Sequence, residues 1–336
     1  MVEKFQMQKN FSEEEAKNLL EQITPNKDCL YIIQPFGLAD ILCSGGLSYA
    51  AQARKNKSAT VLILNETAKN FGIAYENVAL VSYKSPQILL AITNYLEKNE
   101  IYEGDNFIYG YLNPTKPENF TVAEGLNFID YYRKKVLDIP LDTPLHLPIV
   151  KPLSDNEIES LNRRYTFDKN RTIILSITID PKNETAFKFW ENIVNRLKEK
   201  NYIVYSCIEK FSDQFIANTR PILASLSEIS YIAENVKCFI GANAGLFAFL
   251  AMTSTAKIVF VNQFPAWIWD TAKIFPNSRC KTFYVTQDLL KKIVEEWDKE
   301  GVKMQFELSH PKISPDEIFC YYDEVFEKVL NAVEKN

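Results

Sequence analysis

The chain has 336 residues, of which 46% are hydrophobic and 24% are charged, and this composition excludes a disordered or collagen-like protein. Its 43 acidic side chains outnumber its 38 basic ones, so a protein dedicated to nucleic-acid binding is not expected. The length is sufficient for two domains, each with a core of its own.

The sequence has no apolar run of about 18 residues that would cross a bilayer, and its first residues lack the apolar centre of a signal peptide. A cytoplasmic location is therefore expected. Six cysteines are scattered without CxxC spacing, and we interpret them as reduced core thiols. The two histidines, His146 and His310, have no typical ligand nearby, so we expect no bound metal.

The first half of the chain alternates between helical and strand patterns. Ser12 and Glu15 form a capping-box pattern before an amphipathic stretch that continues through Leu20. Helical patterns then separate four short apolar runs with the length of buried strands, at residues 30–36, 60–64, 77–83 and 106–112. This alternation predicts a parallel sheet covered by helices on both faces.

A proline-rich stretch, residues 138–157, separates this half from a second one, because its four prolines prevent a continuous helix and central-strand pairing. Strand patterns then resume at residues 172–178, 202–207, 237–242 and 257–261. We therefore expect two Rossmann-like domains, residues 1–150 and 151–313. A last helix, residues 314–336, has a Ser-Pro start and an apolar stripe that would pack on a domain core.

Three strand-to-helix junctions carry candidate functional residues, because ligands of open parallel sheets bind where strands end and helix N-termini offer free N–H groups. The first junction follows the first predicted strand and consists of Gly37, Leu38, Ala39 and Asp40. Gly37 permits a tight turn, and Asp40 could remove a proton from a bound hydroxyl group. Alternatively, Asp40 only stabilises the start of its helix. Gly45 and Gly46 predict close packing of that helix on the sheet.

The second junction runs from Ser176 to Trp190, where the first strand of the second half ends near Thr178. Lys188 lies in the first turn of the predicted helix, where a positive charge opposes the helix dipole. A bound anion such as a diphosphate would explain this position. The alternative is a solvated surface lysine.

The third junction, residues 241–248, is rich in small side chains. They leave the backbone N–H groups of Ala244, Gly245 and Leu246 accessible to a phosphate oxygen, and Asn243 is placed to cap the helix that follows. The alternative is a close-packed turn between a buried strand and a buried helix.

A basic and aromatic segment, residues 131–135, has the sequence YYRKK. Such a segment could contact an anionic or lipid-linked ligand. The alternative is a solvated helix face.

The ordered junctions resemble those of the bacterial glycosyltransferases related to the lipopolysaccharide heptosyltransferases, family 9 of the GT-B class. Gly37 to Asp40 is similar to the family's Gly-Asp pair, and Lys188-Phe189-Trp190 matches its Lys-x-Trp element. Residues 224–229 look like the family's Leu-Ser-Leu segment. Residues 243–248 stand at the place of its Asp-Ser/Thr-Gly turn, with Asn243, Ala244 and Ala248 replacing the acid, the hydroxyl and the histidine.

The resemblance implies an α/β protein of GT-B architecture, whose two Rossmann-like domains place parallel sheets on either side of a cleft. The first domain would bind the acceptor through Gly37, Leu38 and Ala39, with Asp40 as general base. The second would bind a nucleotide diphosphate-sugar, with Glu209 on the nucleoside. The diphosphate would contact Lys188, Thr178, Asn243, Ala244, Gly245 and Leu246.

The resemblance further implies a glycan or lipid-linked saccharide acceptor of a bacterial surface or lipopolysaccharide type, handled at the cytoplasmic face of the inner membrane. No metal or other cofactor is implied, and the sequence has no DxD motif at a candidate junction. The changes at Asn243, Ala244 and Ala248 leave open a non-catalytic nucleotide-sugar or glycan-binding protein. A nicotinamide-dependent oxidoreductase is disfavoured, because no strand leads into GxGxxG.

Overall fold

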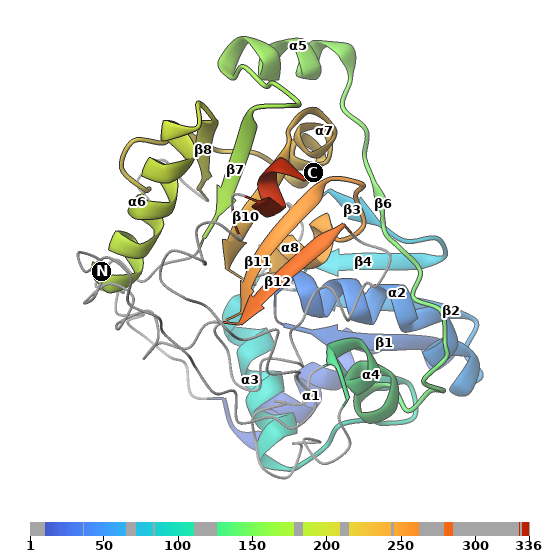
Figure 1. Cartoon of the computed structure of the whole chain (residues 1–336). Coiled ribbons are helices and arrows are strands. Elements are labelled where there is room, and N and C mark those ends of the chain that lie inside the picture. The colour runs from blue at the N-terminus through green and yellow to red at the C-terminus, as the bar shows by residue number, and fades with distance from the viewer. Residues whose placement is uncertain are drawn as a thin grey trace. The chain divides into compact units, whose positions relative to one another are not determined.

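The computed structural model consists of two compact units, Met1–Lys151 and Pro152–Asn336 (Figure 1). The boundary between them along the sequence falls within the proline-rich stretch. It describes residues 11–35, 37–64, 72–82, 85–110, 126–177, 184–208, 215–242, 245–261, 279–284, 329 and 331–335. None of the described helices is long and apolar enough to cross a membrane.

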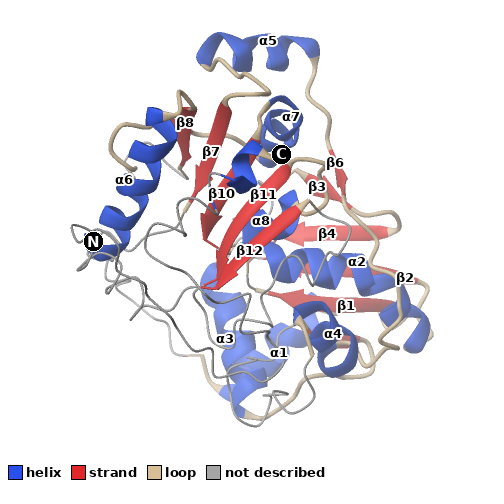
Figure 2. Ribbon diagram, viewed as in Figure 1, coloured by secondary structure: helices blue, strands red, loops and turns tan. Residues whose placement is uncertain are grey.

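The sheet of the first unit has four parallel strands in the order β4-β2-β1-β5. Figure 2 shows three of them, β4, β1 and β2, in red. Its strands are β1 (Cys29–Gln34), β2 (Ala59–Leu64), β4 (Val78–Ser82) and β5 (Phe107–Tyr109). Each strand overlaps a predicted apolar run. The chain places β2 and β4 on one side of β1 and then returns to place β5 on the other side, as in Rossmann-like sheets.

Helices cover both faces of this sheet. The helices of the unit are α1 (Glu13–Ile23), α2 (Leu38–Arg54), α3 (Pro86–Lys98) and α4 (Phe128–Tyr131), which continues into the π-helix η4 (Tyr132–Val136). Helices α1 and α3 bury Leu20 and Ile92 against one face, together with Ile33 of β1. Helix α2 packs on β1 and β2. The predicted capping box of α1 is present, because Ser12 and Glu15 bond each other's backbone N–H groups.

The sheet of the second unit has six parallel strands in the order β12-β11-β10-β7-β8-β9. Its strands are β7 (Thr172–Ser176), β8 (Ile203–Cys207), β9 (Arg220–Ile222), β10 (Cys238–Ala242), β11 (Ala256–Val261) and β12 (Cys280–Tyr284). Counted from β7, this is the Rossmann strand order 3-2-1-4-5-6 read from one edge.

The helices of the second unit are α5 (Asp155–Arg164), α6 (Glu184–Glu199), α7 (Leu226–Asn235) and α8 (Gly245–Leu250). Trp190 of α6 is buried and packs edge-on against Phe260 of β11, with the ring centroids 5.2 Å apart. Val329 and Val333 near the carboxyl terminus are buried in the same core. The predicted start of the last helix lies outside the described residues.

Several elements differ from the sequence prediction. Strands β9 and β12 were not predicted. β9 has three residues and contains Pro221, a residue that is tolerated at sheet edges, and β12, with the sequence CKTFY, is not a continuous apolar run. The proline-rich stretch is also more ordered than a linker. Within it, β6 (Ile149–Val150) pairs antiparallel with β3 (Ile73–Ala74), and α5 begins at Asp155.

Candidate active site

A switch point in the strand order of the first sheet lies between β1 and β5. From β1 the chain continues to β2 and β4 on one side, and it then returns to β5 on the other side. Ligands of doubly wound folds bind at the carboxyl ends of the strands at such a point. Gln34 ends β1, and Gly110 follows β5. The Gly110 N–H donates to the Ile33 carbonyl over 2.8 Å, so the two strand ends are held side by side.

Asp40 stands next to this switch point as the third residue of α2. Its half-buried carboxylate accepts hydrogen bonds from the backbone N–H groups of Asp40 itself and of Gly37, which is the N-cap. Asp40 therefore also stabilises the start of its helix, as the alternative interpretation of this residue predicted. The acid is nevertheless placed where a ligand of the first sheet would bind.

Gly37 does not form the predicted tight turn. Its backbone is extended, with φ −78° and ψ −176°, which every residue type adopts readily. It is also exposed, and an added Cβ atom would meet nothing within 4 Å. The protein itself therefore does not require glycine here. Leu38 is buried and Ala39 is half-buried, so Gly37 is the exposed member of the proposed acceptor-side loop.

A buried network of polar side chains reaches Asp40 from the sheet side. The Tyr132 hydroxyl donates to Asp40 Oδ1 over 2.8 Å and lies 2.9 Å from the Gly110 carbonyl oxygen. The fully buried Gln34 amide nitrogen Nε2 has two hydrogens to donate, and three acceptors lie within reach: the Tyr132 oxygen at 3.0 Å, the Gly110 carbonyl at 2.5 Å and Ser44 Oγ at 2.9 Å. Each strand at the switch point thus supplies one member of the network.

This environment changes the acidity of Asp40. Burial raises the pKa of its carboxyl to about 6, although the bonds from Tyr132 and from the two backbone N–H groups lower it. Such a group is mostly ionised at neutral pH and is a stronger base than an ordinary aspartate. Burial also raises the pKa of the Cys43 thiol and of the Tyr132 hydroxyl, so both stay uncharged beside it.

The tyrosines of the basic and aromatic segment are not part of a solvated helix face. Tyr131 and Tyr132 are 2% and 1% exposed, whereas Lys134 and Lys135 are exposed. Arg133 is turned back into the unit, where it bonds Asp130 Oδ1 at 2.7 Å and the Thr143 carbonyl at 2.9 Å. The segment therefore divides into a buried aromatic part and an exposed lysine pair.

The two glycines of α2 allow close packing, but against neighbours other than the predicted sheet. A Cβ atom at Gly45 would lie 2.3 Å from the Tyr75 ring. A Cβ atom at Gly46 would lie 2.4 Å from the His146 carbonyl oxygen, which is closer than van der Waals contact allows. The Tyr75 hydroxyl lies 3.5 and 3.4 Å from the Ile41 and Leu42 carbonyls, and these contacts hold α2 in place beside β3.

The second unit has an equivalent switch point between β7 and β10, which are paired in parallel register. The strands approach closely at their ends, since a Cβ atom at Gly241 would lie 1.8 Å from the Ser176 carbonyl oxygen. Helix α6 starts at Glu184 after β7, and α8 starts at Gly245 after β10. The helices that follow the second and third predicted junctions therefore come after neighbouring strands, while residues 178–183, 243 and 244 of these junctions lie outside the described residues.

The structure describes only part of the predicted donor site. Lys188 and Gly245 lie within helical backbone, but nothing of the Lys188 side chain is described. Leu246 is half-buried in α8. The remaining residues of the predicted site, Thr178, Glu209, Asn243 and Ala244, lie outside the described residues. Their roles stay predictions.

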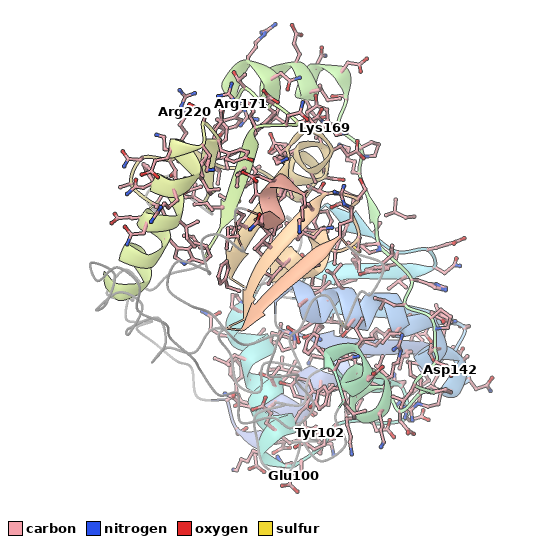
Figure 3. The ribbon with its side chains drawn as sticks, in the orientation of Figure 1. Glu100, Tyr102, Asp142, Lys169, Arg171 and Arg220 are labelled. Carbon is pink, nitrogen blue, oxygen red and sulfur yellow. The ribbon has the colours of Figure 1, made fainter. Side chains whose placement is uncertain are left out.

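Exposed basic side chains lie at the amino-terminal ends of strands of the second sheet. Figure 3 shows Lys169 and Arg171 before β7 and Arg220 at the start of β9. The Arg171 guanidinium donates to the Asn201 carbonyl over 2.7 Å. Ligands of this fold bind at the carboxyl ends of the strands, so these cations are at the opposite ends of the strands from those at which the phosphate contacts are predicted. Among the described residues, no group of His, Cys, Asp and Glu side chains gathers as metal ligands would.

Two Rossmann-like units in one chain define an α/β protein of the GT-B class, and comparisons with solved structures confirm this predicted fold. A family 9 glycosyltransferase from Veillonella parvula DSM 2008 is similar with a TM-score of 0.50 and 9% identity, over 92% of this chain and 97% of that one. ADP-heptose lipopolysaccharide heptosyltransferase II from E. coli is similar with a TM-score of 0.50 and 11% identity, over 91% and 98%.

No protein-family model matches the sequence, and no curated protein matches it significantly. At the identities found, the likeness establishes the fold, and function has to be argued from the site. The chain thus has the fold of the family 9 heptosyltransferases, as its sequence motifs predicted.

Three polar residues of the site were missed from the sequence: Gln34, Ser44 and Tyr132. Gln34 was included in an apolar strand, although a glutamine at the carboxyl end of a buried strand is unusual and signals a polar partner. Tyr132 was considered only as part of a basic segment. No local pattern connects it to Asp40, because 92 positions separate the two residues.

Proposed function

We propose that the protein is a glycosyltransferase, which transfers a sugar from a nucleotide diphosphate-sugar to a hydroxyl group of a glycan or lipid-linked saccharide. The observation that carries this proposal is Asp40, a half-buried carboxylate with a pKa of about 6 at the switch point of the first sheet. The GT-B fold supplies a second such point in the other unit, where a donor would bind.

Asp40 acts in this proposal as general base. The acceptor hydroxyl gives its proton to the Asp40 carboxylate while its oxygen bonds the anomeric carbon of the donor sugar. The bond from that carbon to the diphosphate breaks, and its electron pair leaves with the nucleoside diphosphate. A base with a pKa near 6 is ionised before the reaction and takes the proton more readily than an unperturbed aspartate.

The leaving diphosphate is held in this proposal by the second and third junctions, through Lys188, Thr178, Asn243, Ala244, Gly245 and Leu246. The adjacent starts of α6 and α8 support the assignment, because free N–H groups and a lysine can stabilise growing negative charge without a metal ion. Glu209 follows β8, the other neighbour of β7, and is proposed to bind the nucleoside.

The donor class follows from the fold likeness. One similar structure is named an ADP-heptose heptosyltransferase, so an ADP-linked heptose or hexose is the first donor to examine. The acceptor is proposed to be a bacterial surface glycan or lipopolysaccharide precursor. The reaction would then take place in the cytoplasm, with peripheral contact to the inner membrane.

Thermal unfolding with added nucleotides tests the donor site, since a ligand of the folded state raises the unfolding temperature. ADP, UDP, GDP, CDP and their sugars are compared, and the Lys188→Ala chain should lose most of the shift. Lys198→Ala is the matched control, because it removes a lysine from the last turn of the same helix. No shift with any nucleotide, or an undiminished shift in Lys188→Ala, would contradict the donor assignment.

A non-catalytic binding protein on the same scaffold is the second candidate, since Asn243, Ala244 and Ala248 depart from the family's turn. It predicts a thermal shift with a nucleotide-sugar but no radiolabelled product with any acceptor. Transfer of label to an acceptor decides for the enzyme.

A further inference from the structure

Tyr132 is fixed by its surroundings before any ligand is present. Its ring packs edge-on against Phe128, with centroids 5.1 Å apart, and only 1% of the residue is exposed. It is the first residue of η4, in which the Leu137 N–H donates to the Tyr132 carbonyl over 2.9 Å. π-helical turns are rare and occur frequently at functional sites. The Tyr132 hydroxyl therefore has little freedom to leave Asp40.

The directions of the hydrogen bonds follow from the donors available. An amide nitrogen only donates, so in the contact between Gln34 Nε2 and the Tyr132 oxygen the amide is the donor and the tyrosine oxygen the acceptor. The single hydroxyl hydrogen of Tyr132 then has two acceptors in reach, Asp40 Oδ1 and the Gly110 carbonyl. The carbonyl already accepts from Gln34. A charged Asp40 is the stronger acceptor, so the hydrogen points to it whenever the carboxylate is ionised.

We propose that Tyr132 is a positioning residue for Asp40, which holds the carboxylate in its ionised form and fixed in direction, while Gln34 and the Gly110 carbonyl hold the Tyr132 hydroxyl. The inference rests on the proposed role of Asp40 as base and extends it. It assigns a task to a residue 92 positions away in the sequence.

The charges around Asp40 support this task. Within the described part of the first unit, the titratable groups that face Asp40 are the Tyr132 hydroxyl on η4 and the Cys43 thiol on α2, and burial raises the pKa of both. The positive charge of Arg133 lowers the pKa of the Cys43 thiol, but the Arg133 guanidinium is paired with Asp130 at 2.7 Å. Tyr132 therefore supplies the largest of the interactions that favour the charged carboxylate, ahead of the backbone N–H groups.

The test measures the titration of Asp40 itself in the full-length chain. Aspartate labelled with ¹³C at the carboxyl carbon gives one signal per residue, and the signal missing from Asp40→Asn identifies Asp40. In Tyr132→Phe the midpoint should move upward by about one pH unit, since a hydrogen bond to the charged form is lost. Tyr75→Phe is the control, because it removes another buried hydroxyl that contacts α2 but not Asp40. Its midpoint should stay in place.

A second variant protects the test against misfolding of Tyr132→Phe. 3-Fluorotyrosine at position 132 keeps the ring and the hydroxyl but makes a more acidic donor, so the Asp40 midpoint should move downward. An unchanged midpoint in both variants, or shifts in the reverse directions, would overturn the inference. The titration needs no substrate. If the midpoints move as expected while the native chain transfers no sugar, the proposed function fails and the role of Tyr132 stands.

Discussion

Gly241 approaches Ser176 so closely that a Cβ atom on the glycine would lie 1.8 Å from the serine carbonyl oxygen. The two residues are paired across β10 and β7, next to the ends of the strands that define the switch point of the second unit. A methyl group has no room there, because the atom it would meet belongs to a sheet backbone and cannot rotate away.

Gly241→Ala should therefore destabilise the second unit by more than about 2 kcal/mol, since the two central strands must separate to admit the methyl group. Tryptophan fluorescence in urea measures this selectively, because all four tryptophans follow residue 151. Gly37→Ala is the control, with an added methyl group that meets nothing within 4 Å. Equal unfolding midpoints for Gly241→Ala and the native chain would show that the strands are not this close.

Gly37→Ala also tests the acceptor-side loop. Its extended backbone and exposed position predict a stability change below about 1 kcal/mol, the usual cost at an N-cap. If the acceptor passes over this glycine on its way to Asp40, the methyl group should raise the KM for the acceptor several-fold and leave the KM for the donor unchanged. Steady-state kinetics with each substrate varied in turn measures this. An unaltered acceptor KM would place the acceptor elsewhere.

Asp40→Asn should become more stabilising as the pH rises. In the folded chain the pKa of Asp40 is about 6 against an ordinary value of 3.8, so folding favours the protonated acid. Below pH 3.8 both states are protonated and the raised pKa carries no penalty. Between pH 3.8 and 6 the unfolded chain ionises first, and above pH 6 the folded chain carries the full cost, about 3 kcal/mol.

An asparagine at position 40 does not ionise, so the Asp40→Asn chain has no such free-energy cost on folding. The unfolding free energy of Asp40→Asn, relative to the native chain, should therefore rise by up to about 3 kcal/mol from pH 4 to pH 7.5. Far-ultraviolet circular dichroism in urea at a series of pH values measures the difference. Asp105→Asn, which removes an exposed carboxylate of the same unit, is the control for the loss of one negative charge. A difference that is independent of pH, or that falls as the pH rises, would contradict the burial of Asp40.

The central strands could be predicted from the sequence, because a strand that is buried on both faces has an uninterrupted run of apolar residues. The residues 30–36, 172–178 and 237–242 illustrate this, and the helices that follow them could be placed from the same alternation. Strands β9 and β12 could not, because their sequences, RPI and CKTFY, contain no such uninterrupted apolar run. Asp40 was found because it lies in the first turn of the helix that follows the first strand.

The partners of Asp40 could not be predicted in the same way. Tyr132 contacts Asp40 only through the fold, from the first residue of the π-helix η4, and 92 positions separate the two residues. Gly110 contributes only a carbonyl oxygen, which every residue has. Gly45 was correctly linked to close packing, but only the structure shows that Tyr75 fills the space.

The most direct test of the account is sugar transfer by Asp40→Asn, measured with a radiolabelled nucleotide diphosphate-sugar between pH 5 and 8. Native transfer should fall about tenfold per pH unit below pH 6, as the base becomes protonated. Asp40→Asn should keep its thermal shift with the donor but transfer roughly 10²- to 10⁴-fold more slowly at pH 7.5. Transfer by Asp40→Asn at the native rate, with donor binding intact, would show that Asp40 is not the base.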